Sequence, residues 1–282
     1  MKYKIEKNTV QETLIIPLYA RKVCSELYPN LYRDETAVRL IDEIDYDFSE
    51  AEKKSRSLMQ RFGSLEVAMR QNDLAFEVRD YLKSHPNAAV VNLGCGLDST
   101  GKSCDNGSCK IYNLDFPDVI AVRNELLPAG EREKNIPCDL NDTAWFSQID
   151  ASSGAVFFAS GVFYYFLTEQ VKALVQAMAD AFPGGVLVFD AANRTAVKMI
   201  AKTWLKSAKI QDVGAYFAVS DVPQEIGAWD SRLQVTSRGY MLGYTDLKDP
   251  SVSGFFRFLA KVGDNRMKMQ IAKIEFGKRR FQ

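Results

Sequence analysis

Ala89-Val90-Val91-Asn92-Leu93-Gly94-Cys95-Gly96-Leu97-Asp98 is the stretch of this 282-residue sequence that decides its fold. A short apolar run bounded by glycines predicts a buried strand followed by a tight turn. Glycine permits positive φ in such a turn and lets a ligand approach the main chain closely. In an open α/β sheet the turn lies at the carboxyl end of a strand, where nucleotide-like ligands bind.

From residue 88 onward the pattern alternates between strands and helices. Apolar runs predict strands at 90–93, 110–114, 135–138, 155–159 and 186–190, and a closing pair at 255–259 and 269–276. Pro117 is suited to open a helix, and the apolar spacing after Thr168 predicts another. The chain is therefore expected to be an α/β protein with a mostly parallel sheet that carries helices on both faces.

The sequence predicts two regions. Residues 1–87 contain apolar residues at helical spacing and are expected to form an N-terminal helical cap. Residues 88–282 are expected to form the sheet-containing core. Within this core, residues 191–250 show no clear period and predict helices with intervening loops that cover the ligand edge of the sheet.

Composition limits the possible partners and compartment. The chain has 36 basic and 36 acidic residues, so its formal net charge is zero and gives no sign of a nucleic-acid partner. No apolar run reaches the roughly 18 residues of a membrane span, and the charged start lacks a signal core. Five scattered cysteines suit reduced thiols, so a cytoplasmic protein without a membrane partner is expected. Cys104 and Cys109 are more simply two thiols of a polar loop than a zinc site.

The glycine turn leaves open which ligand it serves. A dinucleotide fingerprint needs a third glycine where this chain has Ser99, and the residues that follow favour a helix poorly. Asp115, at the end of the second strand, can accept hydrogen bonds from both hydroxyls of a ribose. Asp139 can meet an adenine amino group while Leu140 packs on the ring. Together these positions indicate S-adenosylmethionine, and the alternative for both aspartates is simple capping of strand ends.

Several separate stretches resemble the leucine carboxyl methyltransferase family, nearest to its branch of tetracenomycin-type polyketide O-methyltransferases. The resemblance covers roughly residues 9–190. It rests on the following stretches: Thr13-Leu14-Ile15-Ile16-Pro17-Leu18-Tyr19-Ala20-Arg21, Ile44-Asp45-Tyr46-Asp47-Phe48, His85-Pro86, Val91-Asn92-Leu93-Gly94-Cys95-Gly96-Leu97-Asp98, Leu114-Asp115-Phe116-Pro117 and Ser160-Gly161-Val162-Phe163-Tyr164-Tyr165-Phe166.

The resemblance implies a class I methyltransferase, or Rossmann-like, fold with a seven-stranded sheet, and S-adenosylmethionine as cofactor. It also implies that Arg21 binds the methionine carboxylate, a role that suits a guanidinium fork; a surface ion pair is the alternative. The cofactor residues expected from sequence and resemblance together are Arg21, Asn92, Gly94, Cys95, Gly96, Asp115, Phe116, Asp139, Leu140, Ser160 and Gly161. Two departures stand out, because Ser160 replaces the family's usual Glu and Ser99-Thr100-Gly101 replaces its Thr-Arg.

Tyr164 and Tyr165 are the catalytic candidates, as aromatic faces for the sulfonium or as hydroxyls for the substrate, with aromatic core as the alternative. A general base is needed only if the nucleophile is protonated. The only histidine, His85, precedes the first strand and is expected to be structural. Arg194, Trp229 and Tyr240 are the substrate-binding candidates, on composition alone.

The expected function is O-methylation of a carboxylate or phenolic hydroxyl on a small molecule, such as a polyketide-like metabolite. Protein carboxyl methylation is an alternative of the same class. A second alternative is a cofactor-binding protein with altered catalysis, which Ser160 suggests. A nicotinamide dehydrogenase is disfavoured by Ser99.

Overall fold

The computed structural model describes residues 2–5, 10–200 and 216–277. A seven-stranded sheet forms its centre, in the order β5-β4-β3-β6-β7-β9-β8. Six strands run in the same direction, while β9 alone runs antiparallel to its neighbours β7 and β8. These strands span Ala89–Leu93 (β3), Lys110–Asp115 (β4), Glu133–Pro137 (β5), Ala155–Ala159 (β6), Val186–Ala191 (β7), Leu233–Gly239 (β8) and Gln270–Phe276 (β9).

Helices cover both faces of this sheet, as the sequence predicted. One face packs against α4, α8 and α10, and the other packs against α7 and α9. The alternation within β3 explains the two layers, because Val90 belongs to the first apolar cluster and Val91 to the second. The bounds are Leu58–Ser84 (α4), Thr168–Ala181 (α7), Arg194–Ile200 (α8), Val222–Gly227 (α9) and Gly254–Arg266 (α10).

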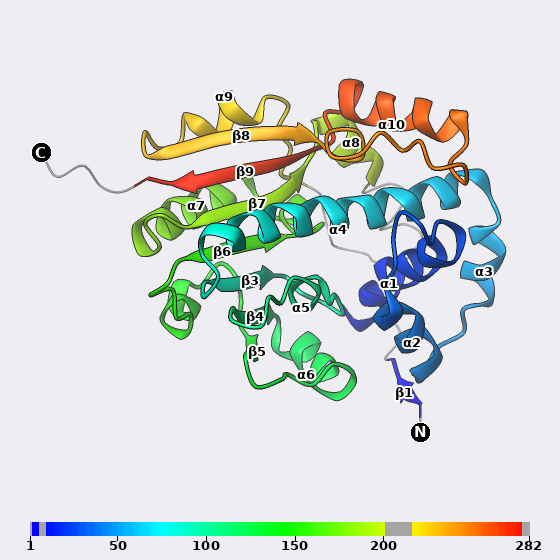
Figure 1. Ribbon diagram of the computed structural model, residues 1–282, viewed down its shortest axis with the longest axis horizontal. Coiled ribbons are helices and arrows are strands. Elements are labelled where there is room, and N and C mark those ends of the chain that lie inside the picture. The colour runs from blue at the N-terminus through cyan, green and yellow to red at the C-terminus, as the bar shows by residue number, and fades with distance from the viewer. Residues whose placement is uncertain (1, 6–9, 201–215, 278–282) are drawn as a thin grey trace, which may run out of the picture.

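The described part of the N-terminal segment is mainly helical up to β3. Helices α1 (Val10–Leu27), α2 (Glu35–Glu43) and α3 (Ser49–Ser55) gather beyond the carboxyl ends of the parallel strands, and α4 crosses the face of the sheet (Figure 1). A two-residue strand pair, β1 (Tyr3–Lys4) with β2 (Ile44–Asp45), lies beside them. The division into a cap of residues 1–87 and a core of residues 88–282 stays a prediction.

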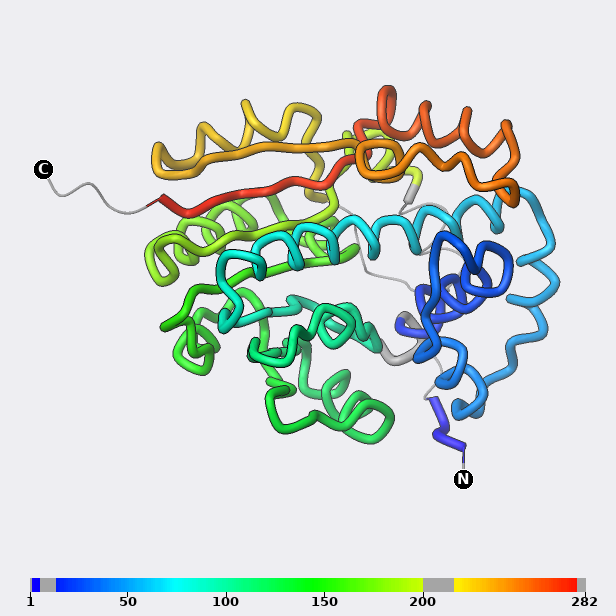
Figure 2. Tube along the Cα trace, viewed as in Figure 1, coloured from blue at the N-terminus to red at the C-terminus, as the bar shows by residue number. Residues whose placement is uncertain are grey.

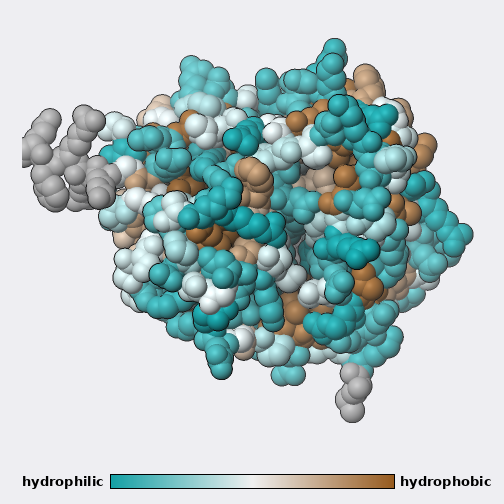
Figure 3. Space-filling model, viewed as in Figure 1, coloured by the Kyte–Doolittle hydropathy of each residue, from teal (hydrophilic) through white to brown (hydrophobic). Residues whose placement is uncertain are grey.

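The remaining elements are short connections between the strands. They are the helices α5 (Thr100–Ser103) and α6 (Pro117–Leu126) and the 3-10 turns η1 (Thr143–Gln148) and η2 (Phe163–Tyr165). Figure 2 follows the chain from the N-terminus beside α2 to β9 at the opposite end. None of the described helices is long and apolar enough to cross a bilayer. Hydrophilic and hydrophobic residues are interspersed on the face shown in Figure 3.

Two sequence predictions for the C-terminal part are wrong. Residues 255–259 lie in α10 and not in a strand, because Phe256, Ala260 and Gly263 repeat at helical spacing on its buried side. Ser253 caps this helix by accepting a hydrogen bond from the backbone N–H of Phe256. The partner of β9 is instead β8, which lies within the segment 191–250 that was expected to hold only helices and loops. Residues 201–215 of that segment lie outside the described residues.

Candidate functional site

A cavity of about 500 Å³ lies where β3, β4 and β6 end, beneath α1 and α4. The strand order reverses between β3 and β6, and ligands of open α/β sheets bind at such a switch point. Its floor is the glycine turn of residues 94–98, and its cover includes Leu14, Ile16 and Pro17 from α1. The stretch that predicted the fold therefore also forms the floor of the cavity.

The glycine turn needs its glycines. Gly94 has a φ of 67° and Gly96 a φ of 46°, both in the left-handed region. A Cβ on Gly94 would lie 2.6 Å from Cγ2 of Val162, which follows β6. The turn is thus packed against the next strand's loop, while Cys95 donates its backbone N–H to the carbonyl of Leu114 at 2.9 Å.

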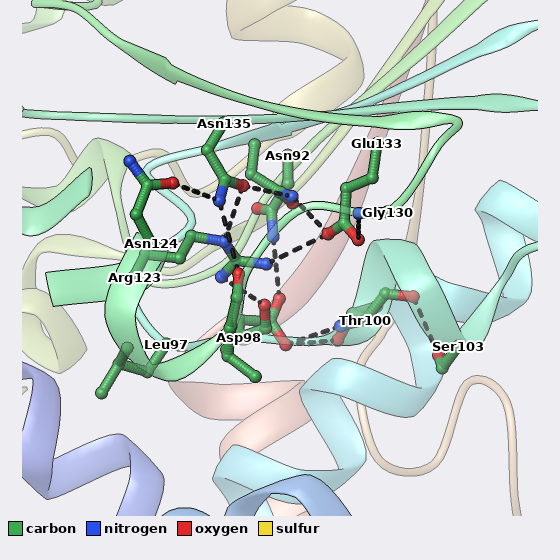
Figure 4. Close-up of polar contacts among 12 residues, drawn as sticks. Asn92, Leu97, Asp98, Thr100, Ser103, Arg123, Asn124, Gly130, Glu133 and Asn135 are labelled. Carbon is green, nitrogen blue, oxygen red and sulfur yellow. Dashed lines mark hydrogen bonds and ion pairs between the residues drawn. The ribbon is translucent and has the colours of Figure 1, made fainter. Parts of the chain in front are cut away.

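A polar network beneath the turn fixes its shape (Figure 4). Arg123, which is only 1% exposed, donates through Nη1 to the carbonyls of Gly96 at 2.9 Å and Asp98 at 2.7 Å. Asn92 donates to the Asp98 carboxylate at 3.1 Å, and Thr100 donates to it through both its backbone N–H and its hydroxyl. Asn92, predicted to touch the cofactor, instead lies behind the turn and supports Asp98, and it does not line the cavity.

Asp115 lines the cavity at the end of β4. Its Oδ2 accepts the backbone N–H of Gly96 at 2.8 Å, and its Oδ1 accepts that of Phe116 at 2.8 Å. Burial raises the pKa of this carboxyl, and the two backbone hydrogen bonds oppose that shift. Both oxygens are therefore held in place with acceptor capacity to spare, as binding of a vicinal diol requires.

The end of β5 differs from the sequence prediction. Leu140 lines the cavity but Asp139 does not, because the Asp139 carboxylate accepts the backbone and side-chain N–H groups of Asn141, both at 2.9 Å. Asn141 lines the cavity in its place, together with Phe116. The apolar and amide groups at this end match the size and polarity of a purine ring, and Asn141 is the residue that the sequence did not single out.

Arg21 reaches the cavity from α1 and is 3% exposed, so it is not a surface ion-pair partner. Its Nε donates to the Asp34 carboxylate at 2.9 Å, and its Nη2 donates to the carbonyl of Leu97 at 2.9 Å. Asp34 also caps α2 through the backbone N–H of Ala37. Arg21 thus ties two cap helices to the glycine turn, and its contact with a cofactor carboxylate stays a prediction.

A second arginine, Arg70 of α4, lines the cavity and was not anticipated. Its Nη1 pairs with the buried Asp190 of β7 at 2.9 Å, and Asp190 also accepts the backbone N–H of Gly161 at 2.6 Å. Gly161 has a φ of 70°, and a Cβ there would lie 3.1 Å from both terminal guanidinium nitrogens. Gly161 is therefore glycine because the guanidinium lies against its Cα.

Aromatic side chains surround the end of the cavity near β6. Tyr164 and Tyr240 are buried, while Tyr165 is 41% exposed, and all three line the cavity. Burial raises the pKa of each phenol, so each stays protonated at neutral pH. Ser160 also lines this end, and its buried Oγ has no hydrogen-bond partner among the described residues.

Two substrate candidates lie elsewhere. Arg194 is exposed on α8 and does not line the cavity. Trp229 packs against Phe217 on the far face of the sheet, with ring centroids 6.2 Å apart.

His85 ends α4 and stacks on Tyr81, in keeping with a structural role. In the part of the chain that the structure describes, no group of three or more His, Cys, Asp or Glu side chains could hold a metal ion.

The family model for leucine carboxyl methyltransferase matches residues 16–179, more than half of the chain. The tetracenomycin polyketide synthesis O-methyltransferase TcmP of Streptomyces glaucescens is 28% identical over 183 residues, 64% of this chain and 66% of that protein. The S-adenosyl-L-methionine-dependent methyltransferase dpfgK of Gibberella zeae is 25% identical over 258 residues, 86% of this chain and 85% of that protein.

Solved structures share the fold at lower identity. A putative methyltransferase from Thermobifida fusca superposes with a TM-score of 0.57 at 18% identity, covering 97% of this chain and 96% of the other. A DUF574 family protein from Streptomyces avermitilis gives the same TM-score at 12% identity, covering 90% and 96%. The expected sheet with its N-terminal helices is thus confirmed as a methyltransferase-like fold.

Proposed function

This chain belongs to the leucine carboxyl methyltransferase family and is an S-adenosylmethionine-dependent methyltransferase, and from that premise we propose that it methylates an oxygen atom of a small molecule. The acceptor oxygen belongs to a phenolic hydroxyl or a carboxylate. The observation that carries the proposal is the single cavity that joins the glycine turn and Asp115 to the tyrosines after β6.

The residues present suit the cofactor in three places. The Asp115 carboxylate, held by two backbone N–H groups, suits the two ribose hydroxyls. Leu140, Phe116 and Asn141 offer the surface for adenine. The positive-φ glycines of residues 94–96 leave room for the amino-acid part, and Arg21 and Arg70 line the same space. S-adenosylmethionine, when bound, supplies a methyl group on a positively charged sulfur.

The protein's task in such a transfer is to hold the acceptor in line with the methyl and to exclude water. Helices α1 and α4 cover the cavity, so they provide the exclusion. Tyr164 and Tyr165 present rings and protonated hydroxyls to the acceptor side, where an aromatic face stabilises the sulfonium and a hydroxyl orients the acceptor oxygen. Tyr240 adds a third phenol from the segment after β8.

The size and cover of the cavity favour a small acceptor over a protein. Its volume of about 500 Å³ lies within the ordinary range of about 300–1,000 Å³ for small-molecule sites. Methylation of a protein terminus would need a groove open to an extended chain, whereas α1 places Leu14, Ile16 and Pro17 over this site. The comparison with TcmP, a polyketide synthesis O-methyltransferase, supports the same choice.

The test is transfer of isotopically labelled methyl from S-adenosylmethionine to a panel of phenols, aromatic carboxylic acids and a peptide with a free terminal carboxylate. Labelled phenol ether or methyl ester is expected, with no label on the peptide. Label on the peptide alone would contradict the proposal. Binding of S-adenosylhomocysteine without any transfer would favour the alternative of a cofactor-binding protein with altered catalysis.

A further inference from the structure

Glu66 is a carboxyl group at the acceptor end of the cavity. It lies on α4 one helical turn before Arg70, is partly buried and lines the cavity. The cavity also contains Asp98 and Asp115, but both carboxylates are engaged by the glycine turn and its neighbours. Among the described residues, the Glu66 carboxylate has no hydrogen bond or ion pair, and the nearby Arg70 pairs with Asp190 instead.

The strand order places Glu66 on the side where the acceptor must enter. The ribose acceptor is at β4 and the adenine surface at β5, so the nucleoside extends from the glycine turn toward one edge of the sheet. The methionine end then points the other way, toward β6 and β7. That end of the cavity is lined by Glu66, Arg70, Tyr164, Tyr240 and Met269.

The charges at this end disfavour an anionic acceptor. The Arg70 guanidinium is already paired with Asp190, whose side chain is 2% exposed. Within the described residues, no second lysine or arginine lines the acceptor end, while Asp264 of α10 adds a further acidic group close to Glu66. Although the buried Nε of Arg70 has no hydrogen-bond partner among the described residues, its charge is balanced by Asp190. A carboxylate acceptor would therefore find no uncompensated cation at this end, and burying an unpaired charge is costly.

We infer that the acceptor is a neutral aromatic hydroxyl, a phenol or an enol, and that Glu66 is the catalytic residue that takes its proton. This inference rests on the proposed methyltransferase function. In the step, the acceptor O–H bond breaks and its proton passes to the Glu66 carboxylate. The oxygen forms a bond to the methyl carbon, and the electron pair of the methyl–sulfur bond stays on sulfur. The Glu66 carboxylic acid then returns the proton to solvent.

The titration of Glu66 suits this role. Burial raises its pKa to about 8, with Arg70 lowering it and Asp264 raising it. The other titratable groups around it are Asp190 of β7 and the phenols of Tyr164 and Tyr240. Burial raises the pKa of both phenols and so keeps them protonated. A base is most effective when its pKa lies near the working pH, and the tyrosines cannot serve because their phenols do not ionise near neutral pH.

The test compares wild type, Glu66→Gln and a matched control, Glu125→Gln, which lies exposed on α6. The probes are 2-naphthol and 2-naphthoic acid, a phenol and a carboxylic acid of the same ring size. Wild type is expected to methylate 2-naphthol at least about tenfold faster than 2-naphthoic acid. Glu66→Gln is expected to lower kcat for 2-naphthol by about 10²–10⁴-fold, the usual contribution of a general base, while Glu125→Gln leaves it unchanged.

The pH profile separates proton transfer from a structural effect. With wild type, kcat should rise with pH and level off near the pKa of Glu66. In Glu66→Gln the rise of kcat should shift to higher pH and follow the ionisation of the naphthol itself, at about pH 9–10. An unchanged profile, a preference for 2-naphthoic acid or no response to either probe would overturn the inference. S-adenosylhomocysteine should bind wild type and Glu66→Gln within about threefold, and failure to bind wild type would instead refute the proposed function.

Discussion

Replacing Arg123 by methionine tests how the glycine turn is held. The substitution keeps much of the side-chain volume and removes the guanidinium. Four contacts are lost: the hydrogen bonds to the carbonyls of Gly96 and Asp98, the 3.1 Å bond from Nε to Asn135, and the 3.7 Å ion pair with Glu133. The two carbonyls then remain buried without this partner. The Glu133 carboxylate loses its buried cation and keeps only hydrogen bonds from Asn113 at 2.7 Å and the backbone N–H of Gly130 at 3.5 Å.

The magnitude follows from these losses. An unsatisfied buried polar group costs about 1–3 kcal/mol, and removing one member of a buried ion pair costs about 3–5 kcal/mol. Because the contacts belong to one side chain, the costs do not add, and a loss of about 3–5 kcal/mol in the free energy of unfolding is expected. That is a large share of the roughly 5–15 kcal/mol that keeps a protein folded.

The assay is urea unfolding followed by circular dichroism and tryptophan fluorescence, with Arg132→Met as the matched control. Arg132 is 43% exposed and pairs with Asp105 at 2.6 Å on the surface, so its loss should cost no more than about 1 kcal/mol. The affinity for S-adenosylhomocysteine should fall in the Arg123 variant alone. Equal stability of the two variants, within about 1 kcal/mol, would refute the role given to Arg123.

Three further predictions concern the carboxylates and the glycine turn. Burial raises the pKa of Asp73 to about 8, so the folded state keeps a proton that the unfolded state loses near pH 4, and stability falls as pH rises between these values. Asp73→Asn should reduce this fall by at least about 1 kcal/mol in chemical denaturation at pH 5 and pH 8. The control is Asp80→Asn, whose side chain is 45% exposed and pairs with Lys83, and an Asp73→Asn variant with the same pH slope as this control would contradict the prediction. Gly94→Ala should destabilise more than Gly107→Ala in thermal unfolding, because both have positive φ but only the first would clash with a neighbouring side chain; equal melting temperatures would argue against the close packing of the turn. Asp115→Ala should weaken binding of S-adenosylhomocysteine by at least about tenfold, the equivalent of about 1.4 kcal/mol, with circular dichroism unchanged, and unaltered calorimetric affinity would exclude the ribose role.

The elements with strong local signals were predictable from the sequence. The strands β3, β6 and β7 are largely apolar, with Asn92 and Asp190 as their polar residues, and are buried on both faces, so length and composition identify them. The C-terminal part was not predictable in the same way. The Phe-rich start of α10 resembles a strand in composition, while β8 carries only Leu233 and Val235 as apolar residues and depends on β9 for its place.

The residues of the site also fall into those that the sequence could predict and those that it could not. Asp115 and the glycine turn were predictable because each lies at a strand end, where the chain itself fixes the position. Arg70 and Arg123 were not, because their partners lie far away in the sequence: 120 residues separate Arg70 from Asp190, and 27 separate Arg123 from Gly96. Such pairings depend on tertiary packing, which a single sequence does not reveal.

Calorimetric titration of the protein with S-adenosylhomocysteine tests the central claim most directly. The cavity over the glycine turn predicts one binding site per chain with micromolar or tighter affinity, and no heat of binding with NAD. The absence of binding to S-adenosylhomocysteine, or binding of NAD in its place, would contradict the account.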